Sequence, residues 1–255
     1  MMPVIFVGHG SPMNAIEDNQ YTKAWRDIAK AIPKPNAILS ISAHWFTEGT
    51  RVLTAENPRI IYDFYGFPKA LYEVDYKAKG ATEFAYKTME MLEEHNVMED
   101  NTWGIDHGTW SVLKIMYPEA DIPVYQMSID RSSNPENLYR IGESIKELRE
   151  QNVLIIGSGN IVHNLSRLDF SIEGGFPWAY EFDEYIRSNI EKSEFEKVIN
   201  YNIIGDSAKY AFPTPEHFYP LLYVLGAADE DDKVTIYNNS CMAGSLSMTS
   251  YVFSQ

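Results

Sequence analysis

Five of the six histidines in this 255-residue chain stand where an imidazole could take part in chemistry. His9 lies between two glycines and His107 precedes one, while His44, His163 and His217 each follow an apolar run or a helix-start signal. Glycines beside a ring leave space around it, which favours function over packing. Imidazole nitrogens bind Zn, Fe, Cu or Ni, and a neutral histidine can act as a general base. The five residues therefore indicate a metal-dependent site, although their spacing identifies no metal.

The elements that must position these histidines are mostly strands. Apolar runs that predict buried strands lie at residues 4–7, 36–42 and 153–156, and each is followed by a histidine. A helix predicted at 21–32 separates the first two runs, which suggests a neighbouring parallel pair joined by a right-handed crossover. Because parallel strands end at one edge of a sheet, we expect His9, His44 and His163 to lie just past that edge.

The rest of the chain continues the alternation of strands and helices. Further helices are predicted at 80–96, 112–116, 134–148 and 176–199, and further strands at 122–129, 234–237 and 246–253. Thr214 and Pro215 form a helix-start signal that displays His217 in the first turn. We expect one α/β domain over residues 1–255, with a mostly parallel central sheet flanked by helices and the active site at the carboxyl ends of the strands.

Three loops carry further candidate residues. The aromatic segment 61–68 is either a hydrophobic plug over the sheet or a wall for an aromatic ligand, formed by Phe64, Tyr65 and Phe67. Asp106, next to His107, is expected to orient a histidine ring nitrogen. The Gly-Ser-Gly turn at 157–159 is a weak phosphate-binding signal, because no lysine of the nucleotide-binding type follows it.

Composition excludes several functional classes. The net charge of −15, from 36 acidic and 21 basic residues, disfavours nucleic acid and anionic membranes as partners. No apolar run approaches the roughly 18–20 residues of a membrane helix, and no targeting segment is recognised, so we expect a cytoplasmic protein. The single cysteine, Cys241, rules out an internal disulfide and is expected to be a small core residue. The oligomeric state stays open.

Several motifs together resemble one known family. The chain is similar to the class III (LigB-type) extradiol ring-cleavage dioxygenases, and most of all to the 4,5-DOPA dioxygenase extradiol family, over nearly its whole length. The motifs that carry the resemblance are GHGSPM (8–13), SAHW (42–45), DFYGFP (63–68), GIDHGTW (104–110), GSGNIVHNL (157–165), EFDEY (181–185) and PTPEHFYPLLYVLGA (213–227).

The resemblance implies a mononuclear non-haem metal held by His9, His44 and His217, with Glu216 as an alternative third ligand. It implies that His163 is the active-site base, which can also touch the metal when zinc is bound. His107 is implied to hydrogen-bond substrate or oxygen. The expected metal is Fe(II) for activity, with Zn(II) as a plausible bound ion, and the expected partners are a small DOPA-like catechol and O2.

Two other readings of the same residues stay open at this point. The first is a zinc hydrolase in which His9, His44 and His217 activate water. The second is a non-enzymatic binding protein with the same fold. The presence of all five candidate histidines favours an enzyme over the binding protein.

Overall fold

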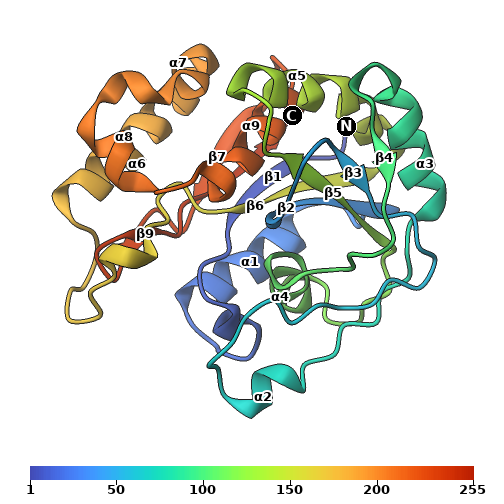
Figure 1. Ribbon diagram of the computed structural model, residues 1–255, viewed down its shortest axis with the longest axis horizontal. Coiled ribbons are helices and arrows are strands. Elements are labelled where there is room, and N and C mark those ends of the chain that lie inside the picture. Colours follow the sequence, from blue (N-terminus) through green and yellow to red (C-terminus); the bar gives the residue numbers. More distant parts are fainter.

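The computed structural model covers residues 1–255 and contains an eight-stranded sheet with a separate two-stranded ribbon (Figure 1). The strands are β1 (Val4–Gly8), β2 (Ala37–Thr47), β3 (Arg51–Val52), β4 (Met98–Glu99), β5 (Val124–Asp130), β6 (Val153–Gly159), β7 (Lys233–Tyr237), β8 (Cys241–Met242), β9 (Leu246–Ser247) and β10 (Ser250–Ser254). The α-helices are α1 (Gln20–Ala31), α2 (Lys69–Tyr72), α3 (Thr82–Met91), α4 (His107–Met116), α5 (Pro135–Ile145), α6 (Pro177–Glu191), α7 (Phe195–Ile199), α8 (Asp206–Ala211) and α9 (Tyr219–Ala227).

The large sheet has the strand order β4-β3-β5-β2-β6-β1-β10-β7. Its four central strands, β5, β2, β6 and β1, all run parallel. Strand β10 pairs antiparallel with β1, and β7 pairs antiparallel with β10, so the end of the chain closes this side of the sheet. The predicted α/β fold with a mostly parallel central sheet is confirmed.

Strands β1 and β2 are not neighbours, contrary to the prediction. Strand β6 lies between them and pairs with both, with Ile5 opposite Ile156 on one side and Ser40 opposite Ile156 on the other. The crossover through α1 therefore passes over one strand position. Pairing order is fixed by how distant helices and strands pack, which the local sequence around α1 does not encode.

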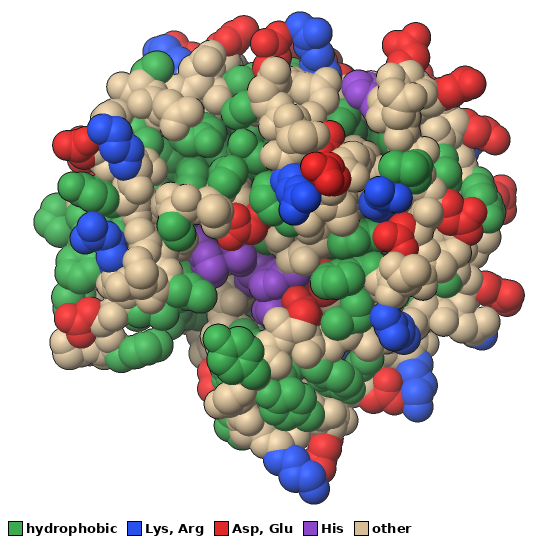
Figure 2. Space-filling model, viewed as in Figure 1, with side chains coloured by type: hydrophobic (Ala, Val, Ile, Leu, Met, Phe, Trp, Pro, Cys, Tyr) green, Lys and Arg blue, Asp and Glu red, His purple; other side chains and the backbone are tan.

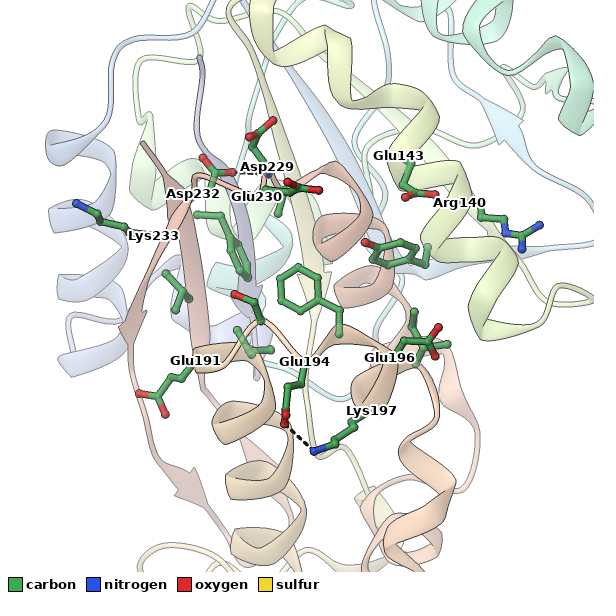
Figure 3. A pocket seen from close by; sticks show the side chains of 18 of the residues that line it. Arg140, Glu143, Glu191, Glu194, Glu196, Lys197, Asp229, Glu230, Asp232 and Lys233 are labelled. Carbon is green, nitrogen blue, oxygen red and sulfur yellow. Dashed lines mark hydrogen bonds and ion pairs between the residues drawn. The ribbon is translucent and has the colours of Figure 1, made fainter.

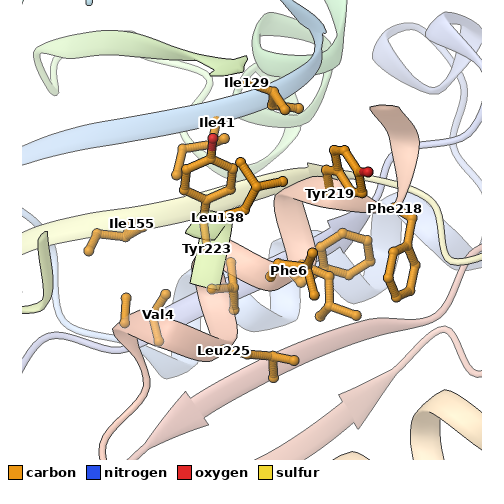
Figure 4. Packing of buried hydrophobic residues seen from close by; sticks show 14 of the residues in the cluster. Val4, Phe6, Ile41, Ile129, Leu138, Ile155, Phe218, Tyr219, Tyr223 and Leu225 are labelled. Carbon is orange, nitrogen blue, oxygen red and sulfur yellow. The ribbon is translucent and has the colours of Figure 1, made fainter. Parts of the chain in front are cut away.

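Helices cover both faces of the sheet and bury two hydrophobic cores (Figure 1). Strand residues alternate between them, as the pleat requires: Val4 and Phe6 face one core, and Ile5 and Val7 face the other. Figure 4 shows the first core, in which Phe6 lies near side chains from α9. The second core contains Trp25 of α1 and Trp110 of α4. Helices α5, α6 and α9 thus pack on one face, and α1 and α4 on the other.

Several helices have boundaries that differ from the predicted ones. Helix α4 begins at His107 rather than at residue 112, because Asp106 accepts a hydrogen bond from the Thr109 backbone N–H as an N-cap. The predicted helix at 80–96 is shorter, ending in a 3₁₀ turn (Glu93–His95), and the one at 134–148 likewise becomes α5 and a 3₁₀ turn (Lys146–Gln151). The 176–199 segment forms two helices, α6 and α7.

Two further expectations concern single features. Cys241 is a buried free thiol in the first hydrophobic core, as expected. None of the helices combines the length and the apolar character that a membrane crossing requires.

Candidate active site

Five histidines meet at one edge of the sheet. Figure 2 shows histidine side chains at the bottom of a hollow on this face, with hydrophobic side chains around them. The rings of His9, His44 and His217 form a near-equilateral triangle, with centroid separations of 5.1 Å (His9–His44), 5.3 Å (His9–His217) and 5.1 Å (His44–His217). The ring centroid of His107 lies 4.0 Å from that of His44, and the ring centroid of His163 lies 3.4 Å from that of His217. The structure thus brings together all five residues that the sequence singled out.

Different elements supply the three residues of the triangle. His9 is the first residue after β1, and its backbone N–H donates to the Gly159 carbonyl at 3.0 Å. His44 lies inside β2 rather than past its end, in the stretch between Ile41 and Phe46 where the strand register shifts. That irregularity in the ladder lets a strand residue turn toward the site. His217 ends the 3₁₀ turn Pro215–His217, which leads into α9.

The Gly-Ser-Gly segment allows close packing of β6 against the backbone around His217. A Cβ atom on Gly159 would lie 2.0 Å from the His217 carbonyl oxygen, and one on Gly157 would lie 2.6 Å from the Pro220 carbonyl oxygen. Both glycines lie within β6, and their missing side chains let the backbone around His217 approach the strand. This close approach explains the two glycines, which the sequence had offered as a weak phosphate-binding signal.

The three triangle residues share one orientation. Each Nδ1 atom faces an oxygen: Ser158 Oγ at 2.9 Å for His9, Asp63 Oδ2 at 3.0 Å for His44, and Glu216 Oε1 at 3.1 Å for His217. The Nε2 atoms face inward. Those of His9 and His44 are 3.3 Å apart, and that of His217 is buried without a hydrogen-bond partner.

This arrangement fits a metal ion. One donor atom from each of His9, His44 and His217 lies within 4.8 Å of the others. Two nitrogens bound at 2.0–2.1 Å to a tetrahedral ion would be about 3.4 Å apart, close to the His9–His44 separation. An inward-facing buried nitrogen with no partner, as in His217, is costly unless it has a ligand. These residues could hold one divalent metal while leaving coordination positions open on the solvent side.

Electrostatics keep most of the histidines neutral. Burial first, and then the charges of neighbouring histidines, hold the pKa values of His9 and His217 well below the ordinary value. Burial and the charges of His44 and His107 lower the pKa of His163 to about 3. Unprotonated rings of this kind offer lone pairs for a metal or for a substrate proton at neutral pH.

His44 is the exception among these residues. Burial opposes its protonation, but the Asp63 contact and the charges of Asp106, Asp63 and Glu216 outweigh burial and raise its pKa. The site therefore combines several imidazoles that burial keeps neutral with three nearby carboxylates, a setting that favours a bound cation.

Asp63 is the site residue that the sequence reasoning missed. Its two carboxylate oxygens lie 3.0 Å from Nδ1 of His44 and 3.0 Å from Nδ1 of His107, and Oδ1 also accepts from the His107 backbone N–H at 2.9 Å. Asp63 thus ties the aromatic loop to two site histidines. The available signal was an acidic residue among aromatic ones, because a partly buried carboxylate needs partners.

Asp106 does not orient a ring nitrogen, contrary to expectation. Its carboxylate accepts hydrogen bonds from the Ser42 hydroxyl at 2.7 Å, the Gln126 amide at 2.8 Å and the Trp103 indole at 3.2 Å. The Ser42 hydroxyl in turn accepts from the His44 backbone N–H at 3.2 Å. Asp106 therefore supports the backbone around the site. Its carboxylate caps α4 and binds Ser42, so it does not contact a histidine ring nitrogen as the sequence predicted.

The aromatic loop lies beside His107. The ring of Phe64 stands edge-on to that of His107 with 5.4 Å between centroids, and Phe67 packs against Phe64 at 5.4 Å. Tyr65 is 91% exposed. Phe64 therefore borders the site with Phe67 packed against it, whereas Tyr65 projects into solvent.

A cavity of about 950 Å³ lies elsewhere, between α5, α7 and β7 (Figure 3). Figure 3 shows carboxylates such as Glu143, Glu194 and Glu230 around its rim, with an aromatic ring between them. No histidine lines it. It is separate from the histidine site, which is the one equipped for chemistry.

Comparison with known proteins decides which family this geometry represents. A family model described as the catalytic LigB subunit of aromatic ring-opening dioxygenase matches residues 3–254. The chain belongs to the LigB family. Family membership makes it an aromatic ring-opening dioxygenase rather than the zinc hydrolase or binding protein that the sequence left open.

Curated relatives of this LigB protein carry a narrower name. The 4,5-DOPA dioxygenase extradiol of Escherichia coli K12 is 43% identical over 98% of this chain and 93% of its own length. The protein of the same name from Beta vulgaris is 39% identical over 97% of this chain and 95% of its own length. The crystal structure of an uncharacterized Escherichia coli K12 protein superposes with a TM-score of 0.87, at 39% identity and full coverage of both chains.

Proposed function

We propose that residues 1–255 act as one catalytic domain that opens the ring of a small, DOPA-like catechol with O2 by extradiol cleavage, at one metal held by His9, His44 and His217. The observation that carries the proposal is the triangle of the His9, His44 and His217 rings, with a donor atom of each within 4.8 Å of the others, beside two further histidines. The names of the relatives support the catechol class, since four of them are called 4,5-DOPA dioxygenase extradiol.

The metal that we propose for the active enzyme is Fe(II). A bound Fe(II) would acidify the catechol, hold it beside O2 and pass electron density between the two. Zn(II) fits the same nitrogen donors but has no redox chemistry, so it is proposed as an inactive occupant. Glu216 is a weaker candidate for the third ligand, because its carboxylate faces Nδ1 of His217 from behind the ring.

His163 is proposed as the base that takes a catechol hydroxyl proton. Its ring is stacked on His217 with an interplanar angle of 7°, which fixes its position next to the ligand set. Its lowered pKa, about 3, leaves the ring unprotonated before substrate arrives. Negative charge developing on the catechol would raise that pKa and stabilise the proton on the ring, which can then be returned during ring opening.

His107 and the aromatic loop are proposed to handle the substrate. Asp63 Oδ1 accepts a hydrogen bond from the His107 backbone N–H at 2.9 Å and lies 3.0 Å from Nδ1 of the same ring, so the other ring nitrogen of His107 is left for a substrate or oxygen atom. Phe64 and Phe67 would stack on the catechol ring and exclude water from the reacting atoms. Tyr65, also proposed for this wall, would reach the substrate only if its exposed side chain folded inward.

Oxygen uptake tests the proposal. The purified protein would be loaded anaerobically with Fe(II), its metal content measured, and then mixed with L-DOPA or simple catechols in air-saturated buffer. We expect O2 consumption coupled one-to-one to a yellow ring-opened product, and no turnover from a zinc-loaded sample. No O2 uptake with any catechol at full iron occupancy would overturn the proposal.

A further inference from the structure

Ser158 connects three parts of the site that are far apart in the sequence. It is the penultimate residue of β6 and is completely buried. Its hydroxyl oxygen lies 2.6 Å from the Gly108 carbonyl oxygen, in the first turn of α4, and 2.9 Å from Nδ1 of His9. In the sheet, Ser158 stands opposite Val7, two residues before His9.

The hydroxyl has only one proton to give. The Gly108 carbonyl oxygen can only accept, so the contact at 2.6 Å requires the Ser158 proton. Toward His9, the same oxygen can then offer only a lone pair. A 2.9 Å contact between it and Nδ1 is therefore favourable only when Nδ1 carries a hydrogen and donates it.

We propose that Ser158 is a positioning residue that fixes His9 in its Nδ1–H tautomer, so that Nε2 presents a bare lone pair to the metal position. This assignment rests on the proposed function only in naming His9 as a metal ligand. Nothing in the position of His9 alone would select the tautomer, because an isolated imidazole can carry its proton on either nitrogen.

The surroundings of His9 agree with this direction of donation. Its Nε2 atom lies 3.3 Å from Nε2 of His44, a contact that needs a proton or a cation between two lone pairs. His44 and His217 each direct Nδ1 toward a carboxylate, whereas His9 has the neutral Ser158. Ser158 thus occupies, without a charge, the place beside Nδ1 of His9 that Asp63 and Glu216 occupy beside Nδ1 of the other two.

Loss of the hydroxyl would leave Nδ1 of His9 buried without an acceptor. His9 is 1% exposed, so water cannot readily replace Ser158. The ring would then shift toward the other tautomer or rotate, and Nε2 would be protonated or misdirected. Partners of this type behind metal-binding histidines are typically worth 10- to 100-fold in metal affinity.

The first measurement uses the metal-free protein labelled with ¹⁵N-histidine. Two-bond proton–nitrogen correlation spectra distinguish the two tautomers of each ring, and a His9→Gln variant assigns the His9 signals. We expect His9 to carry its hydrogen on Nδ1 in the unsubstituted protein. In Ser158→Ala we expect that pure tautomer to be lost.

The second measurement is the affinity for Zn²⁺, determined by competition with a chromophoric chelator. We expect Ser158→Ala to bind Zn²⁺ about 10- to 100-fold more weakly. The matched control is Ser40→Ala: Ser40 is a buried serine of β2 whose hydroxyl lies 2.7 Å from the Thr109 hydroxyl of α4 and makes no hydrogen bond to a histidine. Ser40→Ala should keep the His9 tautomer and bind Zn²⁺ within threefold of the unsubstituted protein.

An Nε2–H tautomer of His9 in the unsubstituted protein would overturn the proposal, whether or not Ser158→Ala folds. Unchanged tautomer and Zn²⁺ affinity in Ser158→Ala would also overturn it. Neither readout depends on oxygen or catechol, so this result is separate from the outcome of the dioxygenase test.

Discussion

Replacing Gly159 by alanine should damage the proposed metal site through the backbone of His217, without changing any of the proposed ligand side chains. Gly159 lies in β6, and an added Cβ would stand 2.0 Å from the His217 carbonyl oxygen and 3.0 Å from its carbonyl carbon. Gly159 is not among the glycines with positive φ, so the backbone conformation itself would tolerate alanine. The whole effect of Gly159→Ala should therefore be steric.

The overlap sets the size of the effect. An ordinary carbon–oxygen contact is about 3.4 Å, so the strand and the Pro215–His217 turn must separate by more than about 1 Å. Misplacement of a functional group by about 1 Å costs on the order of 100-fold in activity. We expect Gly159→Ala to lose about 100-fold in kcat/KM and at least 10-fold in Zn²⁺ affinity, with a stability loss of about 1–3 kcal/mol.

The assay pairs chelator competition for Zn²⁺ with denaturant unfolding. Gly80→Ala is the matched control, because its Cβ would lie 1.8 Å from another backbone carbonyl oxygen, that of Ala55, and near none of the five histidines. Both variants should lose stability, but only Gly159→Ala should lose metal affinity. A folded Gly159→Ala protein with Zn²⁺ affinity within threefold of the unsubstituted protein would refute the reasoning.

Three further substitutions probe separate parts of the molecule. His163→Ala should keep its iron content and lose about 10²- to 10⁴-fold in kcat, the usual worth of a general base; metal analysis and O2 uptake test this. Phe64→Ala should raise KM about 2- to 10-fold through lost ring contact, and more than Tyr65→Ala does, in steady-state kinetics. Burial, partly offset by hydroxyls of Ser247 and Thr249, raises the pKa of Asp183 from 3.8 to about 6. The folded state then holds this proton more tightly, so up to about 3 kcal/mol of stability is present below pH 4 and lost as pH rises through 6. The free energy of unfolding of metal-free Asp183→Asn should therefore lack that decline. Between pH 4 and 7, denaturant unfolding should show the unsubstituted protein losing stability relative to Asp183→Asn.

The sequence predicted the edge of the sheet at which the histidines meet, because that follows from local patterns. Apolar runs such as residues 153–156 predict buried strands, and parallel strands must end together. The order of the strands could not be predicted from the sequence, because the position of β6 between β1 and β2 depends on packing between distant elements. The position of His44 was missed for a similar reason: the register shift in β2 is defined by its partner β5.

The supporting residues of the site were harder to predict than the histidines. Asp63 acts across 44 residues on His107, and Ser158 acts across 149 residues on His9. Such contacts leave only an indirect signal in the sequence, a polar residue within an otherwise buried segment. Ser158 in an apolar strand is one example, because a buried hydroxyl must find partners somewhere in the fold.

The supporting residues also explain how a divalent ion could be buried here. Burial lowers the pKa values of His9, His217, His163 and His107, and the charges of neighbouring histidines lower them further. Neutral imidazoles alone would leave the charge of a buried ion uncompensated. The carboxylates of Asp63, Asp106 and Glu216 raise the pKa of His44, and they would supply opposing charge to an ion held by His9, His44 and His217. Because none of the three would need to bind the ion directly, the proposed nitrogen donors of His9, His44 and His217 would be enough to hold it, and positions would be left for an oxygen-bearing substrate.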